Sequence, residues 1–206
     1  MYIIGITGGI ACGKSLVSNE LKKYGARIIS ADKMAHWLMS PCNEIYNEYV
    51  KHFGENILRE DGRLSRKKIA KIIFNNKNEL KWVNEMAHPI LRRYVRERLV
   101  AYQRKKRSLI VLDVPLLFEA GWEIECDEVW VVILDRDKQI QRLMKRNHLN
   151  LADAESRIEA QLNDDERRKR ADVIIDNNLD RENTCDQIRR QIEKKFPHLI
   201  KNYEEI

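Results

Sequence analysis

A short segment near the start of the chain combines glycines with a lysine and a serine at the spacing of a phosphate-binding loop. It reads Gly8-Gly9-Ile10-Ala11-Cys12-Gly13-Lys14-Ser15 and matches the pattern G-x-x-x-x-G-K-[ST]. Glycines let the backbone turn tightly and present N–H groups to phosphate oxygens, while the lysine adds a mobile charge and the serine offers a hydroxyl to Mg²⁺. The segment therefore predicts binding of a nucleotide triphosphate together with Mg²⁺.

The expected nucleotide contacts follow the loop without a gap. They are Gly9, Ile10, Ala11, Cys12, Gly13, Lys14, Ser15 and Leu16. Two interpretations of Cys12 stay open. Nearby N–H groups and the charge of Lys14 lower the pKa of a thiol, and alkylation of a reactive Cys12 would then block nucleotide binding. Alternatively, Cys12 is an inert small side chain.

Two carboxylates directly follow predicted strands. Asp32 comes just after the predicted strand at 27–30, and Asp113 closes the apolar run 109–112. Ligands of open parallel sheets bind beyond the carboxyl ends of the strands, so both acids should face the phosphates. We assign Asp32 as the base that accepts the proton of an attacking hydroxyl, and Asp113, with Ser15, as the metal-side group. The alternatives are a helix N-cap for Asp32 and a turn residue for Asp113.

Apolar runs that alternate with helical patterns predict the elements that position these residues. The runs typical of buried strands lie at about 2–6, 27–30, 109–112, 129–134 and 173–175. An amphipathic helix is expected from Lys14 to Tyr24, with Gly25 as its stop. The alternation predicts an α/β fold with a five-stranded parallel sheet in a three-layer core.

The segment between the second and third predicted strands is too long for one crossover helix. It carries helical patterns at about 31–50, 65–75, 78–87 and 90–106. We interpret it as a helical substrate-binding insertion, at about 32–107. The arginines of its last pattern form either a solvated face or an anion-binding wall; they are Arg92, Arg93, Arg96 and Arg104.

A charged stretch after the fourth predicted strand indicates a lid at about 136–170. Arg142 and Arg146 lie four residues apart and share a helix face, and Arg167 lies in the polar segment that follows. Phosphoryl transfer benefits from mobile cations that close over the reacting group and exclude water. The alternative is a solvated charged helix, because acids are interspersed. The chain, 1–206, is then one domain with core segments at about 1–31, 108–135 and 171–195.

Composition narrows the class of protein. Hydrophobic residues make up 43% and charged residues 34%, as in ordinary soluble domains. No apolar run approaches the roughly 20 residues of a membrane helix, and the first residues lack the features of a signal peptide. The four cysteines match neither a zinc site nor a C-x-x-C pair, which suits reduced thiols in the cytoplasm. The net charge of +6 favours anionic partners without identifying one.

A series of segments resembles the dephospho-coenzyme A kinases over about residues 2–195. In order, they are Ile6-Thr7-Gly8-Gly9-Ile10, Gly13-Lys14-Ser15, Ala31-Asp32, His88-Pro89, the run from Asp113 to Glu119, Gln139, the run from Arg142 to Arg146, Gln161 and the run from Ala171 to Asn177. The run from Asp113 to Glu119 is far more specific than the phosphate loop, which many NTPases share. The sequence departs from the family at Ala11-Cys12, where Gly-Ser is common, and at Leu16, where Thr is common.

The resemblance implies an adenylate kinase-like P-loop core with a helical coenzyme A-binding insertion and a lid. It implies that Mg-ATP phosphorylates the ribose 3′-hydroxyl of dephospho-CoA, giving CoA and ADP. We expect a monomer or weak homo-oligomer without a nucleic-acid or membrane partner. Asp32, Lys14 and Arg146 are the implied catalytic residues, and Arg142 and Asn177 join the nucleotide contacts. The implied substrate contacts are Thr7, Asp32, His88, Asp113, Leu116, Arg146 and Gln161.

Three other functions compete with this interpretation. Another P-loop metabolite kinase would share the loop. A GTPase would need N-K-x-D, but Asn76-Lys77-Asn78-Glu79 lies in the helical insertion, and position 116 is Leu rather than the glycine of D-x-x-G. A nucleic-acid-dependent ATPase would bind nucleic acid through the basic run 104–107, which is otherwise interpreted as a charged turn. Such motor proteins often carry Glu directly after the Asp at the strand end, but position 114 is Val.

Overall fold

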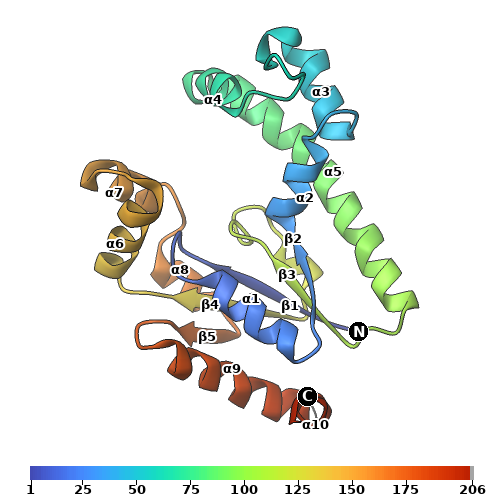
Figure 1. Cartoon of the computed structure of the whole chain (residues 1–206), viewed down its shortest axis with the longest axis vertical. Coiled ribbons are helices and arrows are strands. Elements are labelled where there is room, and N and C mark those ends of the chain that lie inside the picture. The colour runs from blue at the N-terminus through green and yellow to red at the C-terminus, as the bar shows by residue number, and fades with distance from the viewer. Residues whose placement is uncertain (205–206) are drawn as a thin grey trace. The chain divides into compact units, whose positions relative to one another are not determined.

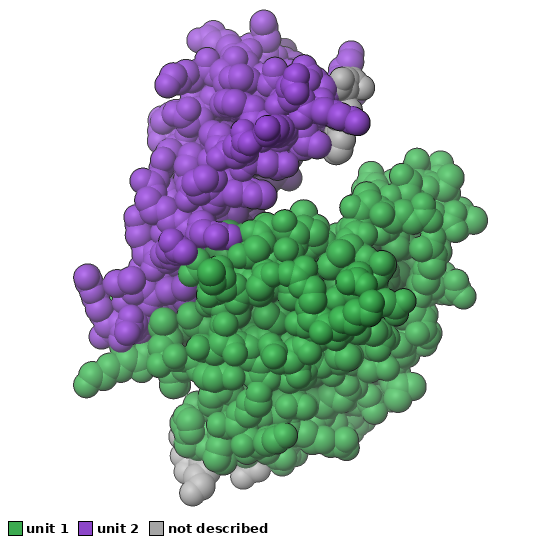
Figure 2. Space-filling view, turned by 180° about the vertical axis from the view of Figure 1, so that it is seen from behind, with its two compact units in different colours: residues 1–29, 105–206 green, residues 30–104 purple. Residues whose placement is uncertain are grey.

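The chain divides into two compact units. The computed structural model describes the backbone of residues 1–204, and side chains other than those of 74, 75 and 201–206. The first unit comprises residues 1–29 and 105–206, and the second comprises residues 30–104 (Figure 2). Each unit has its own cluster of buried apolar side chains, so each is described separately.

A five-stranded sheet forms the centre of the first unit (Figure 1). Its strands are β1 (Tyr2–Gly8), β2 (Arg27–Ser30), β3 (Leu109–Asp113), β4 (Glu128–Ile133) and β5 (Val173–Asp176). The strand order is β2-β3-β1-β4-β5; β1 pairs in parallel with β3 and β4, and β4 with β5. The predicted five-stranded parallel sheet is confirmed, including the positions of all five strands.

The helices of the first unit cover this sheet and extend beyond it. They are α1 (Lys14–Lys23), α6 (Arg136–Asn147), α7 (Leu151–Glu159), α8 (Asp164–Lys169), α9 (Arg181–Lys195) and α10 (Pro197–Glu204), with a short 3₁₀ turn at Glu123–Glu125. Val17 and Leu21 of α1 and Ile188 of α9 share one apolar cluster with alternate residues of the central strands. α1 and α9 therefore pack on the same face of the sheet and bury the apolar side chains of that face.

The second unit is built from helices alone. They are α2 (Ala31–Leu38), α3 (Glu44–Phe53), a 3₁₀ turn at Glu55–Ile57, α4 (Arg66–Asn75) and α5 (Lys77–Arg104). Their common core contains Leu38, Ile45, Ile57, Ile69 and Val83. These residues come from all five elements, which explains how a unit without a sheet reaches a compact structure.

Two of the helical boundaries expected from the sequence are wrong. The pattern at 31–50 forms two helices, because the chain turns between them at Cys42, whose φ is 67°. The patterns at 78–87 and 90–106 instead form one helix, α5, with Pro89 inside it. Side chains before and after Pro89, among them Val83 and Tyr94, pack against the same core, so continuous packing outweighs the hydrogen bond that proline removes. Within residues 1–204, no helix is both long and apolar enough to cross a bilayer.

Candidate active site

The predicted phosphate loop connects the end of β1 to the start of α1, and its backbone is contorted. Gly8 has φ 150°, Ala11 has φ 62° and Gly13 has φ 102°. A Cβ atom added at Gly8 would lie 2.3 Å from the carbonyl oxygen of Val132, and one at Gly13 would lie 2.2 Å from the Nδ2 atom of Asn177. Only glycine fits these two positions, which fixes the shape that presents the loop N–H groups.

The amino-terminal end of α1 is left open for an anion. Its N-cap residue, Gly13, has no side chain to cap the helix, and its first turn contains no acidic residue. The partial positive charge of the helix terminus is therefore not neutralised by the helix itself. The Lys14 Nζ atom donates to the carbonyl oxygens of Gly8 at 2.8 Å and Gly9 at 3.4 Å, so the lysine lies along the loop that would hold the phosphates.

Cys12 is fully buried beneath the loop and belongs to the apolar cluster of the sheet. Burial raises the pKa of its thiol above the ordinary value, and the charge of Lys14 only partly opposes this. The expectation of a lowered pKa is therefore wrong, because desolvation outweighs the nearby cation. The structure favours the inert interpretation of Cys12.

Two amide side chains from distant parts of the sequence hold the loop in place. Asn177, which is buried, donates to the carbonyl oxygen of Cys12 at 2.7 Å and accepts from the hydroxyl of Thr184 at 3.0 Å. Gln161 accepts from the backbone N–H of Ile10 at 2.8 Å. We expected Asn177 among the nucleotide contacts and Gln161 among the substrate contacts; in the structure both bind loop backbone.

Asp113 lies where a metal-side acid was expected. It ends β3 opposite Ile6 of the neighbouring strand β1, and its Oδ2 atom lies 3.3 Å from the hydroxyl of Ser18 on α1. Ser15 and Ser18 are three residues apart and share one face of that helix. The Asp113 carboxylate therefore lies on the side of α1 that carries Ser15, and the metal role of the two residues stays a prediction.

The residues around Asp113 show which expected substrate contacts are open. Thr7 is fully buried, and its hydroxyl donates to the carbonyl oxygen of Pro115 at 3.0 Å, which ties the end of β1 to the segment after β3. Leu116 in that segment has 46% of its surface exposed. Leu116 is thus available for contact, whereas Thr7 has a structural hydrogen bond.

The arginines expected in the lid have different surroundings. Arg142 on α6 lies near the loop, with its Nη1 atom 3.8 Å from an ideal Cβ on Gly13. Arg146, at the end of the same helix, is exposed and donates from Nε to the side chain of Asn147 at 2.9 Å. Arg142 is therefore already beside the loop, whereas Arg146 is open to solvent.

Arg167 is a cation whose position could not be read from the sequence. It is buried, it donates from Nη1 to Asp164 at 2.7 Å, and its Nη2 atom lies 3.8 Å from Glu119. Its Nε and Nη2 atoms have no hydrogen-bond partner within the described part of the chain. With Gly9 and Gln139, it lines a cavity of about 320 Å³ beside the phosphate loop. Of the residues near Arg167, the sequence analysis singled out Gln139 and Glu119 only because they lie in segments that resemble the family.

Two further predicted residues, Asp32 and His88, lie in the second unit. Asp32 is exposed in the first turn of α2, directly after β2. The N-cap of α2 is Ser30, whose hydroxyl accepts from the N–H of Lys33, so the N-cap interpretation of Asp32 is wrong and its carboxylate is free of that role. His88 lies on α5, where partial burial and then the charge of Arg92 lower the pKa of its imidazole.

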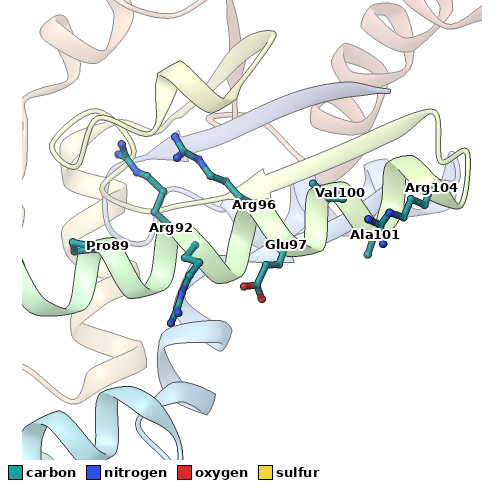
Figure 3. Close-up of a pocket in the computed structure, with 8 residues that line it drawn as sticks. Pro89, Arg92, Arg96, Glu97, Val100, Ala101 and Arg104 are labelled. Carbon is teal, nitrogen blue, oxygen red and sulfur yellow. The ribbon is translucent and has the colours of Figure 1, made fainter.

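The arginines of α5 line a cavity of about 630 Å³ along the helix (Figure 3). Arg92 and Arg96 are one turn apart and point to the same side, whereas Glu97 points to the other (Figure 3). Arg93 instead forms an ion pair with Glu44 and lies over the ring of Tyr94. The anion-binding interpretation of this face stays a prediction.

Comparisons with known proteins agree on one family. The family model described as "Dephospho-CoA kinase" matches residues 2–183. A dephospho-CoA kinase of Carboxydothermus hydrogenoformans is 42% identical over 93% of this chain and 93% of its own length. One of Symbiobacterium thermophilum is 41% identical over 94% of this chain and 79% of its own.

Solved structures give the same picture. A dephospho-CoA kinase from Campylobacter jejuni superposes with a TM-score of 0.70 and 28% identity, covering 93% of this chain and 96% of that one. A shikimate kinase from Bacteroides thetaiotaomicron superposes with a TM-score of 0.51 at 13% identity, covering 94% of this chain and 97% of that one, a likeness of fold alone. The expected P-loop kinase core is confirmed.

Proposed function

Because the chain belongs to the dephospho-CoA kinase family, an ATP-dependent kinase family of coenzyme A biosynthesis, we propose that the phosphate loop, Asp113 and Asp32 carry out its reaction here. The reaction transfers the γ-phosphoryl group of ATP to the ribose 3′-hydroxyl of dephospho-CoA, giving CoA and ADP in the last step of the pathway. The observation that carries this assignment of residues is the loop itself, with glycine-only backbone positions before an open helix terminus.

The loop and α1 bind the triphosphate of ATP in this proposal. Residues 9–16 surround the phosphates through the loop N–H groups other than those of Ile10, Cys12 and Leu16, which donate to Gln161 and to loop carbonyl oxygens. The end of α1 adds its positive dipole. Lys14 exchanges the carbonyl oxygens of Gly8 and Gly9 for the β- and γ-phosphates, a short movement of one flexible side chain. Arg142, already beside Gly13, adds a second positive charge, and Arg146 closes from the lid.

Mg²⁺ fits the groups at the start of α1. The Ser15 hydroxyl and the Asp113 carboxylate are hard oxygen donors on the same side of that helix. The described residues contain no group of three or more His, Cys, Asp or Glu side chains able to hold a metal ion. That suits an ion held by one or two protein groups and by substrate phosphates, where it neutralises charge on the phosphates.

Asp32 is the proposed general base. It accepts the proton of the 3′-hydroxyl as the oxygen attacks the γ-phosphorus, and its exposed position in the first turn of α2 leaves the carboxylate open to a substrate. We propose that the insertion, about 32–107, binds dephospho-CoA. The proposed acceptor site also contains His88, Leu116, Asp113 and Arg146. Thr7 and Gln161 contribute by holding the backbone around it, through their hydrogen bonds to Pro115 and Ile10.

We also propose a compartment and an oligomeric state for the enzyme. The four cysteines are all free, which suits a reducing compartment such as the cytoplasm. We propose a monomer or weak homo-oligomer that needs no nucleic acid. The basic run at the end of α5 then serves as a charged surface rather than a nucleic-acid contact.

The decisive experiment measures ADP release with Mg-ATP and a panel of acceptors. Dephospho-CoA should support turnover, and adenosine, AMP and shikimate should support far less. Omitting Mg²⁺ in the presence of EDTA should abolish the activity. Absence of turnover with dephospho-CoA, or faster turnover with another acceptor, would contradict the proposed acceptor.

A further inference from the structure

A cationic cavity lies within the second unit, between α2 and the start of α4. Its volume is about 600 Å³, within the range of roughly 300–1,000 Å³ that is typical of small-molecule sites. No acidic residue lines it, whereas the residues that carry positive charge or can do so are His36, Arg59, Arg63, Arg66 and Lys67. The cavity therefore selects for a ligand with more than one negative charge.

The backbone that presents these cations is held by hydrogen bonds. The segment 59–63 forms a turn in which the N–H of Arg59 donates to the carbonyl oxygen of Arg63 at 2.8 Å. The hydroxyl of Tyr46 donates to the carbonyl oxygen of Gly62 at 2.7 Å, and Leu58 and Leu64 pair on either side of the turn. The cations are thus carried by a fixed frame, which lowers the entropy lost when a ligand binds.

Three of the cations are not neutralised by an acid. Arg59 forms an ion pair with Asp61 at 3.3 Å. Arg66 contacts only the ring nitrogens of His36, and no hydrogen bond or ion pair involves the side-chain nitrogens of Arg63 or Lys67 within the described residues. The helix that begins at Arg66 also has no acidic residue in its first turn, so its terminus adds to the positive potential.

The position of the cavity relates it to the proposed base. His36 lies four residues after Asp32 on α2, so the two side chains share a face and are separated by about 6 Å along the helix axis. Both are exposed on that helix. A ligand that reaches from Asp32 to the cavity must therefore carry its hydroxyl and its negative charges a short distance apart.

We propose that this cavity binds the diphosphate of dephospho-CoA, an inference that rests on the proposed function. In this nucleotide the ribose 3′-hydroxyl and the 5′-diphosphate are joined by a short chain of single bonds, which matches one helical turn between Asp32 and His36. Arg63 and Arg66 bind the diphosphate oxygens, and Lys67 adds a less directional charge. The diphosphate thereby places the 3′-hydroxyl at Asp32.

The test compares single-cation variants in binding and in turnover. Arg63→Ala and Arg66→Ala should each raise the calorimetric Kd for dephospho-CoA by about 10–100-fold, the usual effect of losing a charge-assisted hydrogen bond. The KM for ATP should not change, and binding of adenosine, which has no diphosphate, should be equal in variants and wild type. Lys51→Ala, which removes an exposed cation of α3 outside the cavity, is the matched control and should leave every value unchanged.

Two results would overturn the inference. One is an unchanged Kd for dephospho-CoA in both arginine variants, and the other is an equal loss of adenosine binding, which would indicate a structural effect. The side chain of Arg63 is exposed and forms no hydrogen bond or ion pair within the described residues, so a folding defect is not expected to obscure the result for Arg63→Ala. A wild-type protein that does not phosphorylate dephospho-CoA would contradict the proposed function itself, whereas active wild type with unaffected variants would contradict only this site.

Discussion

The phosphate loop and the cationic cavity are both suited to phosphate groups, but the loop offers main-chain groups and the cavity offers side chains. In the loop, main-chain N–H groups are the proposed phosphate contacts, and their directions are set by positive-φ backbone at Ala11 and Gly13 and by the buried Asn177. In the cavity, exposed arginine and lysine side chains supply the charge. The loop should therefore be sensitive to any change of shape, whereas the cavity should be sensitive mainly to loss of charge.

The largest expected effect separates chemistry from nucleotide binding. Asp32→Asn in the second unit should lower kcat by about 10²–10⁴-fold, because an oriented base contributes that much to proton transfer. The affinity for ATP should be nearly unchanged, since the loop is intact. Steady-state kinetics with dephospho-CoA, together with calorimetric ATP binding, measures both quantities. Glu85→Gln, an isosteric change at an exposed acid of α5, is the control; near-normal turnover of Asp32→Asn would remove the base from the mechanism.

A smaller loss is expected when the loop keeps its shape but loses its charge. Lys14→Ala should lower kcat by about 10²–10³-fold, as removal of one preorganised electrostatic group does in other enzymes. The buried contacts of Asn177 and Gln161 would persist, so the melting temperature should stay close to that of the wild type. The matched control is Lys22→Ala, at an exposed position of the same helix. Full activity of Lys14→Ala would argue against the assigned role of the loop.

Shape is tested by a pair of glycines with positive φ. Gly13→Ala places a Cβ 2.2 Å from Asn177, whereas Gly54→Ala in the second unit meets nothing within 4 Å. We expect Gly13→Ala to weaken ATP binding by more than about tenfold, because the clash displaces the loop. Gly54→Ala should lower the unfolding free energy by about 1–3 kcal/mol, the strain of a side chain at φ 73° and ψ −177°, and should leave ATP binding unchanged.

Equal ATP affinity in the two glycine variants would contradict the distinction between shape and charge. Calorimetric titration with ATP gives the affinities, and urea unfolding gives the stabilities. Gly54 is a suitable partner because its φ of 73° is also positive, whereas no atom lies within 4 Å of a Cβ added there.

The sequence predicted the sheet and the loop because both depend on local signals. Runs such as 109–112 and 129–134 are apolar throughout, and the glycine–lysine–serine spacing fixes a strand, a loop and a helix together. The helix through Pro89 was not predictable from local preference, because packing on both sides of the proline decides it. The raised pKa of Cys12 likewise depends on burial beneath the loop.

The two side chains that hold the phosphate loop could not be predicted from local sequence either. Asn177 and Gln161 were recognised through family resemblance, but their hydrogen bonds to Cys12 and Ile10 join residues more than a hundred positions apart. Nothing in the local sequence specifies such pairs. The sequence did not predict a role for the cations of the turn at 59–63, because a charge in a polar segment is usually solvated. Only the folded chain brings them together with Arg66 around a cavity.

The smallest expected effect concerns pH and the second unit. The pKa of His88 is lowered from the ordinary 6.5 by burial and by Arg92, so between the two values the unfolded chain binds more protons than the folded one. The contribution of His88 to the unfolding free energy is therefore fully present above pH 6.5. It is lost as the pH falls toward the lowered pKa of the folded state. His88→Gln should reduce the loss of unfolding free energy between about pH 7.5 and about pH 5.5, measured by urea denaturation. An identical pH dependence in variant and wild type would show that the protonation of His88 is not coupled to folding.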